Sequence, residues 1–145
     1  GENPYNESMA TELHDRIRDL EQRFAQVREI FDLSGKQTEL ADLKRQSERS
    51  DIWNDAEEAR AVTKRLSDLS EQVSFWQRFE HDFKDLSELA ELGKDDPDTL
   101  KEVASNLTEL EQEFTKHESA ALLAGEHDSR AAHITIQAGA GGTDA

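Results

Sequence analysis

The five histidines are the side chains of this 145-residue chain best suited to hold a metal ion or to transfer a proton near neutral pH. A helical zinc site places two histidines four residues apart around a glutamate, and no pair in this sequence has that spacing. His117 falls within an apolar repeat, where packing at the edge of a core is the better interpretation. We therefore expect no metal site and no cofactor. The histidines are His14, His81, His117, His127 and His133.

Neighbouring carboxylates, such as Glu57–Glu58 and Asp95–Asp96, could in principle act as an acid and a base. That chemistry needs a partly dry cleft in which the two pKa values separate. With 33 acidic residues in the chain, such neighbours are expected by chance on a solvated helix surface. No serine–histidine–aspartate arrangement can be argued either. We expect no catalytic residue in this chain, and hence no enzyme activity of its own.

A glycine-rich segment close to residue 145 is the most distinctive motif. It contains Gly139, Gly141, Gly142 and Thr143, and it follows a period-two pattern at 133–137 that predicts a strand. Phosphate-binding loops also follow strands, but this segment lacks the Gly-Lys-Ser/Thr ending of a P-loop. On physical grounds it is a flexible or tightly turned connector, with a phosphate site as the alternative.

The net charge of −16, from 17 basic and 33 acidic residues, restricts the partners of the chain. Independent binding of nucleic acid needs a surplus of Lys and Arg near the phosphates, and anionic membranes attract basic segments. We expect neither partner. A basic protein surface is the natural complement, since opposite charges speed the encounter. The alternative is that the charge only keeps long helices in solution.

Composition also limits the fold and the compartment. Hydrophobic residues make up 34% of the chain, which suits narrow apolar stripes between helices rather than a thick core. Seven glycines and two prolines leave room for long uninterrupted helices. There is no cysteine, and no window approaches the ~20 apolar residues of a membrane span. We expect a cytoplasmic protein.

The first part of the chain predicts two helices. Apolar residues recur at alternating steps of four and three from Leu13 to Phe31, which is typical of one helix face. Ser34–Gly35 should end this helix, because glycine suits the left-handed residue after a helix end. A short helix then runs from Gln37 to about Ser47. The inward positions are Leu13, Ile17, Leu20, Phe24, Val27 and Phe31 in the first helix, and Leu40 and Leu43 in the second.

Two longer apolar repeats predict a helical hairpin. Asn54 or Asp55 should cap a helix that ends at Leu92–Gly93. Asp96–Pro97 should start the next helix, which ends at Ala124–Gly125. Because a short turn joins two helices that cannot bury their seams alone, they should fold back antiparallel. The seams are Ala59, Val62, Leu66, Leu69, Val73, Trp76, Phe79 (or Glu80 in strict register), Phe83, Leu86 and Ala90, then Leu100, Val103, Leu107, Leu110, Phe114, His117 and Ala121.

The sequence thus predicts an all-α fold, an antiparallel hairpin of long helices with an additional amino-terminal helix, ending in the first strand of a missing second domain. Residues 1–8 have no periodicity and read as a tag or disordered tail. Residues 9–125 form the helical amino-terminal domain. Residues 126–145 form a linker and the start of a truncated central domain, because a lone strand is not stable in water.

Two groups of residues carry a resemblance to a known family. The segment Ile134–Ala145 resembles the start of the central domain in bacterial class I peptide chain release factors. Its Ala-Gly-Gly-Thr stretch is similar to the family member that reads the stop codons UAA and UGA. Trp53, Asn54 and Asp55 resemble the amino-terminal domain of the same member. The resemblance covers roughly residues 9–145, and Asp144 stands where the family more often has glutamate.

The resemblance implies the role of the family's first domain. That domain is a helical arm that docks near the stalk-base protein of the large ribosomal subunit, while other domains decode and hydrolyse. The decoding tripeptide and the Gly-Gly-Gln loop would lie beyond residue 145, so no decoding or catalytic residue is carried over. The turn Lys94–Asp98 and the turn at Trp53 are candidate ribosome contacts, or plain solvated turns.

Two other functions stay open on the sequence. One is a stand-alone coiled-coil scaffold that self-associates through its apolar seams. The other is a related ribosome-rescue hydrolase, which would share the Gly-Gly-Gln loop but lack the decoding tripeptide. A tight dimer at low concentration would favour the scaffold, whereas a monomeric bundle suits the arm.

Overall fold

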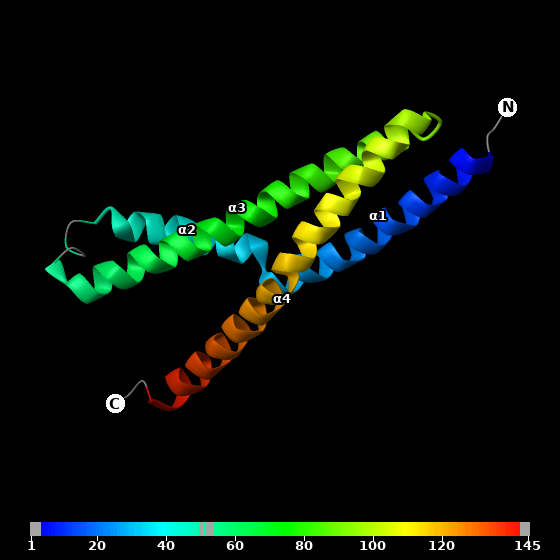
Figure 1. The fold of residues 1–145 in the computed structure, drawn as a ribbon. Helices are drawn as coiled ribbons and strands as arrows, with labels where there is room; N and C mark the ends of the chain where they lie inside the picture. Colours follow the sequence, from blue (N-terminus) through cyan, green and yellow to red (C-terminus); the bar gives the residue numbers. More distant parts are fainter. Residues whose placement is uncertain (1–3, 50, 52–53, 143–145) are drawn as a thin grey trace.

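Four helices make up most of what the structure, a computed structural model, describes, which is residues 4–49, 51 and 54–142. They are α1 (Pro4–Phe31), α2 (Leu33–Ser47), α3 (Ala56–Leu92) and α4 (Pro97–Gly142). Side chains are described for 7–49, 51 and 54–126. Figure 1 shows an elongated bundle in which α3 and α4 meet at a common tip, with α1 and α2 beside them. The predicted all-α fold is confirmed.

The first helix carries the predicted apolar seam. All six seam residues from Leu13 to Phe31 are buried. The helix begins at Pro4, so α1 takes in part of the segment that the sequence assigned to a tail. Residues 1–3 lie outside the described residues, and the assignment of 1–8 to a tag stays a prediction.

The break between α1 and α2 lies at Asp32 and not at Ser34–Gly35, where the prediction was wrong. Asp32 takes the left-handed conformation, with φ 58°, and its side chain accepts a hydrogen bond from the Gly35 N–H at 3.1 Å. A Cβ at position 35 would lie 2.1 Å from Asp32 Oδ2. Glycine therefore leaves room here for the capping carboxylate in the first turn of α2, and it does not end α1.

The limits predicted for α3 are confirmed. Asp55 Oδ1 accepts hydrogen bonds from the N–H groups of Glu57 at 3.0 Å and Glu58 at 3.2 Å. These are two of the amide groups that a helix start leaves without an internal partner. At the other end, the Gly93 N–H donates to the Leu89 carbonyl at 2.9 Å and closes the last turn.

The turn into α4 also follows the prediction. Asp96 accepts hydrogen bonds from the Asp98 N–H at 3.2 Å and from the Thr99 hydroxyl at 2.7 Å. Pro97 occupies the first helical position, where its missing N–H costs nothing. Two long helices joined by this short turn run antiparallel, and they separate with distance from the tip (Figure 1). The predicted hairpin is confirmed.

Each of the other two helices packs mainly on one helix of the hairpin. α2 folds back along the start of α3, where Arg65 pairs with Glu39 at 2.9 Å. α1 packs on α4 and runs parallel to it, because both of its ion pairs, Arg16–Glu111 and Arg23–Glu118, join residues 95 positions apart. In an antiparallel pair, the difference in residue number would change from one contact to the next.

One core runs through all four helices. The largest fully buried side chains are Phe24, Phe31 and Phe114, followed by leucines and valines of the seams. The buried set is Leu13, Ile17, Leu20, Phe24, Val27, Phe31, Leu33, Leu43, Leu69, Val73, Trp76, Phe79, Phe83, Leu86, Leu100, Val103, Leu107, Leu110, Phe114 and Ala121. Leu40, Val62, Leu66 and Ala90 pack against it and are partly buried.

Two predictions for the end of the chain were wrong for this structure. α4 continues through Gly125, and residues 133–137, predicted as a strand, belong to the same helix. A Cβ at position 125 would lie 2.2 Å from the Ile30 carbonyl oxygen, so this glycine allows α1 and α4 to approach. A strand needs a neighbour for its backbone hydrogen bonds, whereas a helix satisfies them internally. The division of the chain at residue 126 stays a prediction.

Candidate functional site

An aromatic cluster fills the centre of the bundle where α1, α3 and α4 meet. The Phe24 ring stacks on Trp76 with centroids 5.9 Å apart and meets Phe79 edge-on at 5.0 Å. Phe114 of α4 contacts the same two α3 rings at 5.5 and 5.3 Å. Trp76 and Phe79 are buried. The cluster is therefore core packing, and these buried rings provide no platform for stacking bases.

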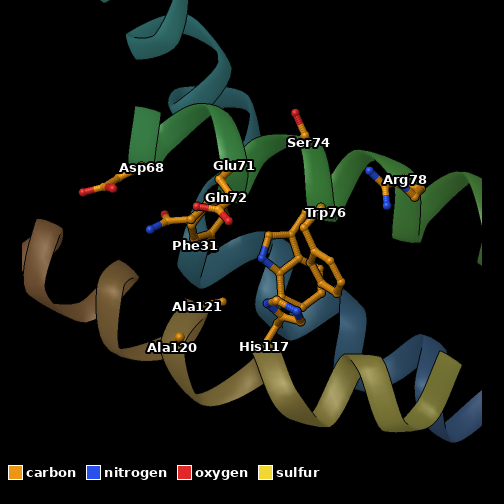
Figure 2. Close-up of a pocket in the computed structure, with 11 residues that line it drawn as sticks. Phe31, Asp68, Glu71, Gln72, Ser74, Trp76, Arg78, His117, Ala120 and Ala121 are labelled. Carbon is orange, nitrogen blue, oxygen red and sulfur yellow. The ribbon is translucent and has the colours of Figure 1, made fainter. Parts of the chain in front are cut away.

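A groove lies beside this cluster where α3 and α4 diverge. Figure 2 shows Trp76 pointing from α3 towards α4, and His117 pointing from α4 towards the indole. The His117 ring stacks on Phe75 with centroids 3.6 Å apart, so it lies at the edge of the packing as predicted. Asp68 lines the groove but points outward in Figure 2. The lining of the groove thus mixes apolar side chains such as Trp76 with polar ones such as Glu71, and no ion pair joins the acidic and basic residues described there.

Two bidentate ion pairs hold α1 against α4. Arg16 donates to Glu111 at 2.5 and 3.3 Å, and Arg23 donates to Glu118 at 2.7 and 3.3 Å. The hydrogen bond to the glutamate raises the pKa of each arginine above its ordinary value. The Arg23 guanidinium also lies 4.9 Å from the centre of the Phe114 ring. These pairs lie beside the buried apolar seam of α1.

The negative charge of the chain is concentrated on the α3–α4 hairpin. Residues 67–126 contain sixteen acidic and five basic residues, whereas residues 33–66 contain seven of each. At the tip, Leu92 is 86% exposed, and Lys94 contacts Glu91 at 3.5 Å. The predicted contact segment Lys94–Asp98 therefore lies at the end of a strongly acidic rod, and its residues are exposed.

The residues singled out as a family motif lie in different settings. Trp53 and Thr143 lie outside the described residues. Asn54 is exposed and Asp55 caps α3, so Asp55 has a structural task. Gly139, Gly141 and Gly142 lie in the last turns of α4. No described contact joins the two groups, and whether they share a function stays a prediction.

Within the described ranges, no group of three or more His, Asp or Glu side chains is arranged to hold a metal ion. None of the described helices combines the length and the apolarity that crossing a membrane requires.

Comparison with known proteins identifies the family. Residues 36–145 match the family described as PCRF domain. The chain belongs to the class I peptide chain release factors. It is 35% identical over 139 residues to peptide chain release factor 2 of Chloroflexus aggregans and 37% identical over 139 residues to that of Kineococcus radiotolerans. It is 34% identical over 132 residues to that of Haemophilus influenzae.

This release-factor chain is shorter than those relatives. The matches cover 94%, 94% and 90% of the chain but 38%, 38% and 36% of the Chloroflexus, Kineococcus and Haemophilus proteins. No solved structure matches the chain. The relatives bear the name of the family member that the glycine-rich segment and the Trp53 turn indicated.

The release-factor domain also depends on residues that sequence reasoning missed. Arg16, Arg23 and Ile30 repeat every seven residues on α1, and their α4 partners Glu111, Glu118 and Gly125 have the same spacing. That shared seven-residue interval is the signature of two helices with a constant contact face. It could have revealed the α1–α4 pairing. α1 lies before the matched range, yet it supplies part of the common core.

Proposed function

We propose that this domain is the docking arm of a translation termination factor. It binds the large ribosomal subunit at the stalk-base protein, while other parts of the complete protein read the stop codon and promote hydrolysis of peptidyl-tRNA. The arm itself is not an enzyme and binds no nucleic acid independently. It works in the cytoplasm, where translation takes place.

The observation that carries this proposal is the concentration of negative charge on the hairpin of a release-factor domain. Sixteen acidic residues against five basic ones between residues 67 and 126 suit a basic protein partner and repel RNA phosphates. Residues 33–66, which include α2 and the start of α3, contain equal numbers of acidic and basic residues. The hairpin, and its tip at Lys94–Asp98 in particular, is thus the part of the arm that we assign to the ribosome.

Stop-codon specificity belongs to the complete protein. The curated relatives are named peptide chain release factor 2, and we infer that the complete protein directs release at UAA and UGA. Nothing in residues 1–145 is assigned to codon reading or to hydrolysis. The functional task of the described residues is positioning.

A peptide release assay tests this division of labour. Ribosomes carry labelled peptidyl-tRNA with UAA, UGA or UAG in the decoding site, and the 145-residue chain is added alone or together with the complete factor. Alone, the chain should release no peptide at any codon. In excess, it should slow release by the complete factor at UAA and UGA, because both compete for one docking site.

Charge variants show whether the hairpin is responsible for this competition. Glu88→Lys with Asp95→Lys changes exposed hairpin positions, and the matched control Glu7→Lys with Glu29→Lys makes the same change in net charge on α1. Competition should be lost with the hairpin variant and kept with the control. Peptide release by the chain alone, or equal loss with both variants, would contradict the proposal.

A further inference from the structure

A second groove with acidic walls lies on the α3–α4 hairpin, nearer its tip than the groove in Figure 2. Asp82 and Asp85 of α3 form one wall, and Glu109 and Glu113 of α4 form the other. Each pair is spaced by about one helical turn, so the carboxylates of a pair lie on the same side of their helix. Among the described residues that line the groove, none is basic.

The floor of this groove is apolar and partly accessible. Leu86 and Leu110 reach it from the core and are 5% and 8% exposed, whereas Leu89 is 36% exposed. Leu89 is one of the few large hydrophobic side chains that the described surface leaves open to water. An accessible leucine between two acidic walls offers an apolar anchor point with negative charge on both sides.

On the opposite flank of the same hairpin, a helix with basic side chains covers an acidic surface of α4. There, α1 lies along α4 (Figure 1), and Arg16 and Arg23 of α1 bind Glu111 and Glu118. Glu109 and Glu113 are each two positions from Glu111, which places them about 200° around the helix from it. One flank of α4 is therefore covered by a helix with basic side chains, and the other flank carries the same acidic chemistry.

Three of the four carboxylates of the groove have no ion pair within the described part of the chain. Asp85 contacts His81 of its own helix at 3.2 Å. For Asp82, Glu109 and Glu113, the described residues provide no ion pair and no side-chain hydrogen bond. Three negative charges beside an accessible leucine are thus available to a cationic partner.

We propose that this groove binds a basic amphipathic helix of a partner protein. The helix would place an aliphatic ridge on Leu89 and lysines or arginines against both acidic walls. On the other flank, α1 makes the same kind of contact with α4 through Arg16 and Arg23. This assignment deepens the proposed docking function, since it names the surface of the arm and the chemistry of the segment it receives.

A defined synthetic helix tests the groove directly. The probe is a fluorescein-labelled amphipathic peptide of three heptads, with leucines along one face and lysines flanking them; the matched peptide has glutamine in place of lysine. Titration into the 145-residue chain is followed by fluorescence anisotropy. Amide chemical shifts of the chain locate the bound peptide. We expect saturable binding of the lysine peptide, with shift changes at residues 82–89 and 106–113.

Two triple variants separate the groove from general attraction between opposite charges. Asp82→Asn with Glu109→Gln and Glu113→Gln neutralises the groove. Glu7→Gln with Glu29→Gln and Glu126→Gln removes the same charge at exposed positions elsewhere. The groove variant should bind the peptide at least tenfold more weakly, and the control should stay within about twofold of the parent chain. Since all six side chains are exposed, circular dichroism should show both variants folded.

Leu89→Ser tests the apolar part of the site and should weaken binding without changing net charge. Equal weakening by both triple variants, shift changes spread over the whole hairpin, or no binding to the parent chain would overturn the proposal. The peptide experiment contains no ribosome, so it can succeed while the release competition fails, or fail while the competition succeeds. The two proposals are thereby judged separately.

Discussion

Gly125 of α4 lies against the backbone of Ile30 of α1, where a Cβ would come within 2.2 Å of the Ile30 carbonyl oxygen. This contact continues the register of the Arg16–Glu111 and Arg23–Glu118 ion pairs, with seven residues between successive contacts. The two helices are therefore held by the buried apolar seam of α1 with two ion pairs beside it, and by close backbone approach at the end of the interface. The contact also explains why a glycine lies inside α4 instead of ending it.

Gly125→Ala should destabilise the domain. Alanine is the better helix former by about 1 kcal/mol, but its Cβ would push the α1 backbone away, and overpacking of this kind costs roughly 1–3 kcal/mol. We expect a net loss of about 1 kcal/mol in the free energy of unfolding. Urea unfolding measures it. Ser105→Ala, at an exposed position of α4, is the control and should be neutral or slightly stabilising; a stabilising Gly125→Ala would disprove the close contact.

The Arg23–Glu118 pair should contribute modestly. Its side chains are 35% and 22% exposed, so solvent screens the attraction, and a double-mutant cycle with Arg23→Ala and Glu118→Ala should give a coupling of about 0.5–1 kcal/mol. Arg23→Ala should cost more than Glu118→Ala, because the guanidinium also covers the Phe114 ring. Equal single costs would show that the ring contact adds nothing.

The guanidinium of Arg23 should not titrate near neutral pH, so it should not make the coupling energy depend on pH there. Hydrogen bonding to Glu118 raises the pKa of Arg23 above its ordinary value. A raised pKa of a basic group gives stabilisation that is complete below the unfolded-state pKa and is lost only as the pH rises through the folded-state pKa. For arginine both values lie far above neutrality, so the coupling should be the same at about pH 6 and pH 9. A coupling energy that falls between these two pH values would contradict the assignment of Arg23 as the hydrogen-bond donor to Glu118.

Asp32 should respond differently to glycine and to alanine. Asp32→Ala removes the cap of α2 and keeps a β-carbon in the left-handed region, as Asp32 itself does, so it should cost about 1 kcal/mol for the lost cap. Asp32→Gly also loses the cap but relieves the backbone, so its cost should be a few tenths of a kcal/mol. Thermal unfolding of the two variants checks the order. An alanine variant as stable as the glycine variant would mean that Asp32 is not held in the left-handed conformation.

Much of the fold was predictable because its signals are local. Asp55 and Asp96 are strong caps, and the apolar spacing between them and beyond them identifies the long helices and their buried faces. Both the α3 boundaries and the antiparallel hairpin follow from those signals. The parallel course of α1 along α4 did not follow from them, because periodicity identifies a buried face without naming the face that covers it.

Glycine caused the main errors. Gly35 and Gly125 each follow an apolar repeat and were predicted as helix ends, but each makes room for a neighbour: the Asp32 carboxylate in one case and the Ile30 carbonyl in the other. Such neighbours are known only once the chain is folded. The period-two pattern at 133–137 failed for a related reason, since strand formation depends on a pairing partner and not on the pattern alone.

The candidate site was less predictable than the fold. The motif residues Asn54 and Asp55 were recognised by type, and the structure gives Asp55 the task of a cap. The acidic groove at Asp82, Asp85, Glu109 and Glu113 was not singled out, because carboxylates abound along both helices. Only the pairing of α3 with α4 brings these four to one groove.

We propose that the acidic arm docks on a protein at the stalk base of the large ribosomal subunit. The most direct measurement is sedimentation of the 145-residue chain with large ribosomal subunits that contain or lack the stalk-base protein, at physiological salt. Binding to complete subunits that weakens at least tenfold when this protein is removed, and recovers when it is added back, is the predicted result. Equal binding to both kinds of subunit, or binding to neither, would contradict the account.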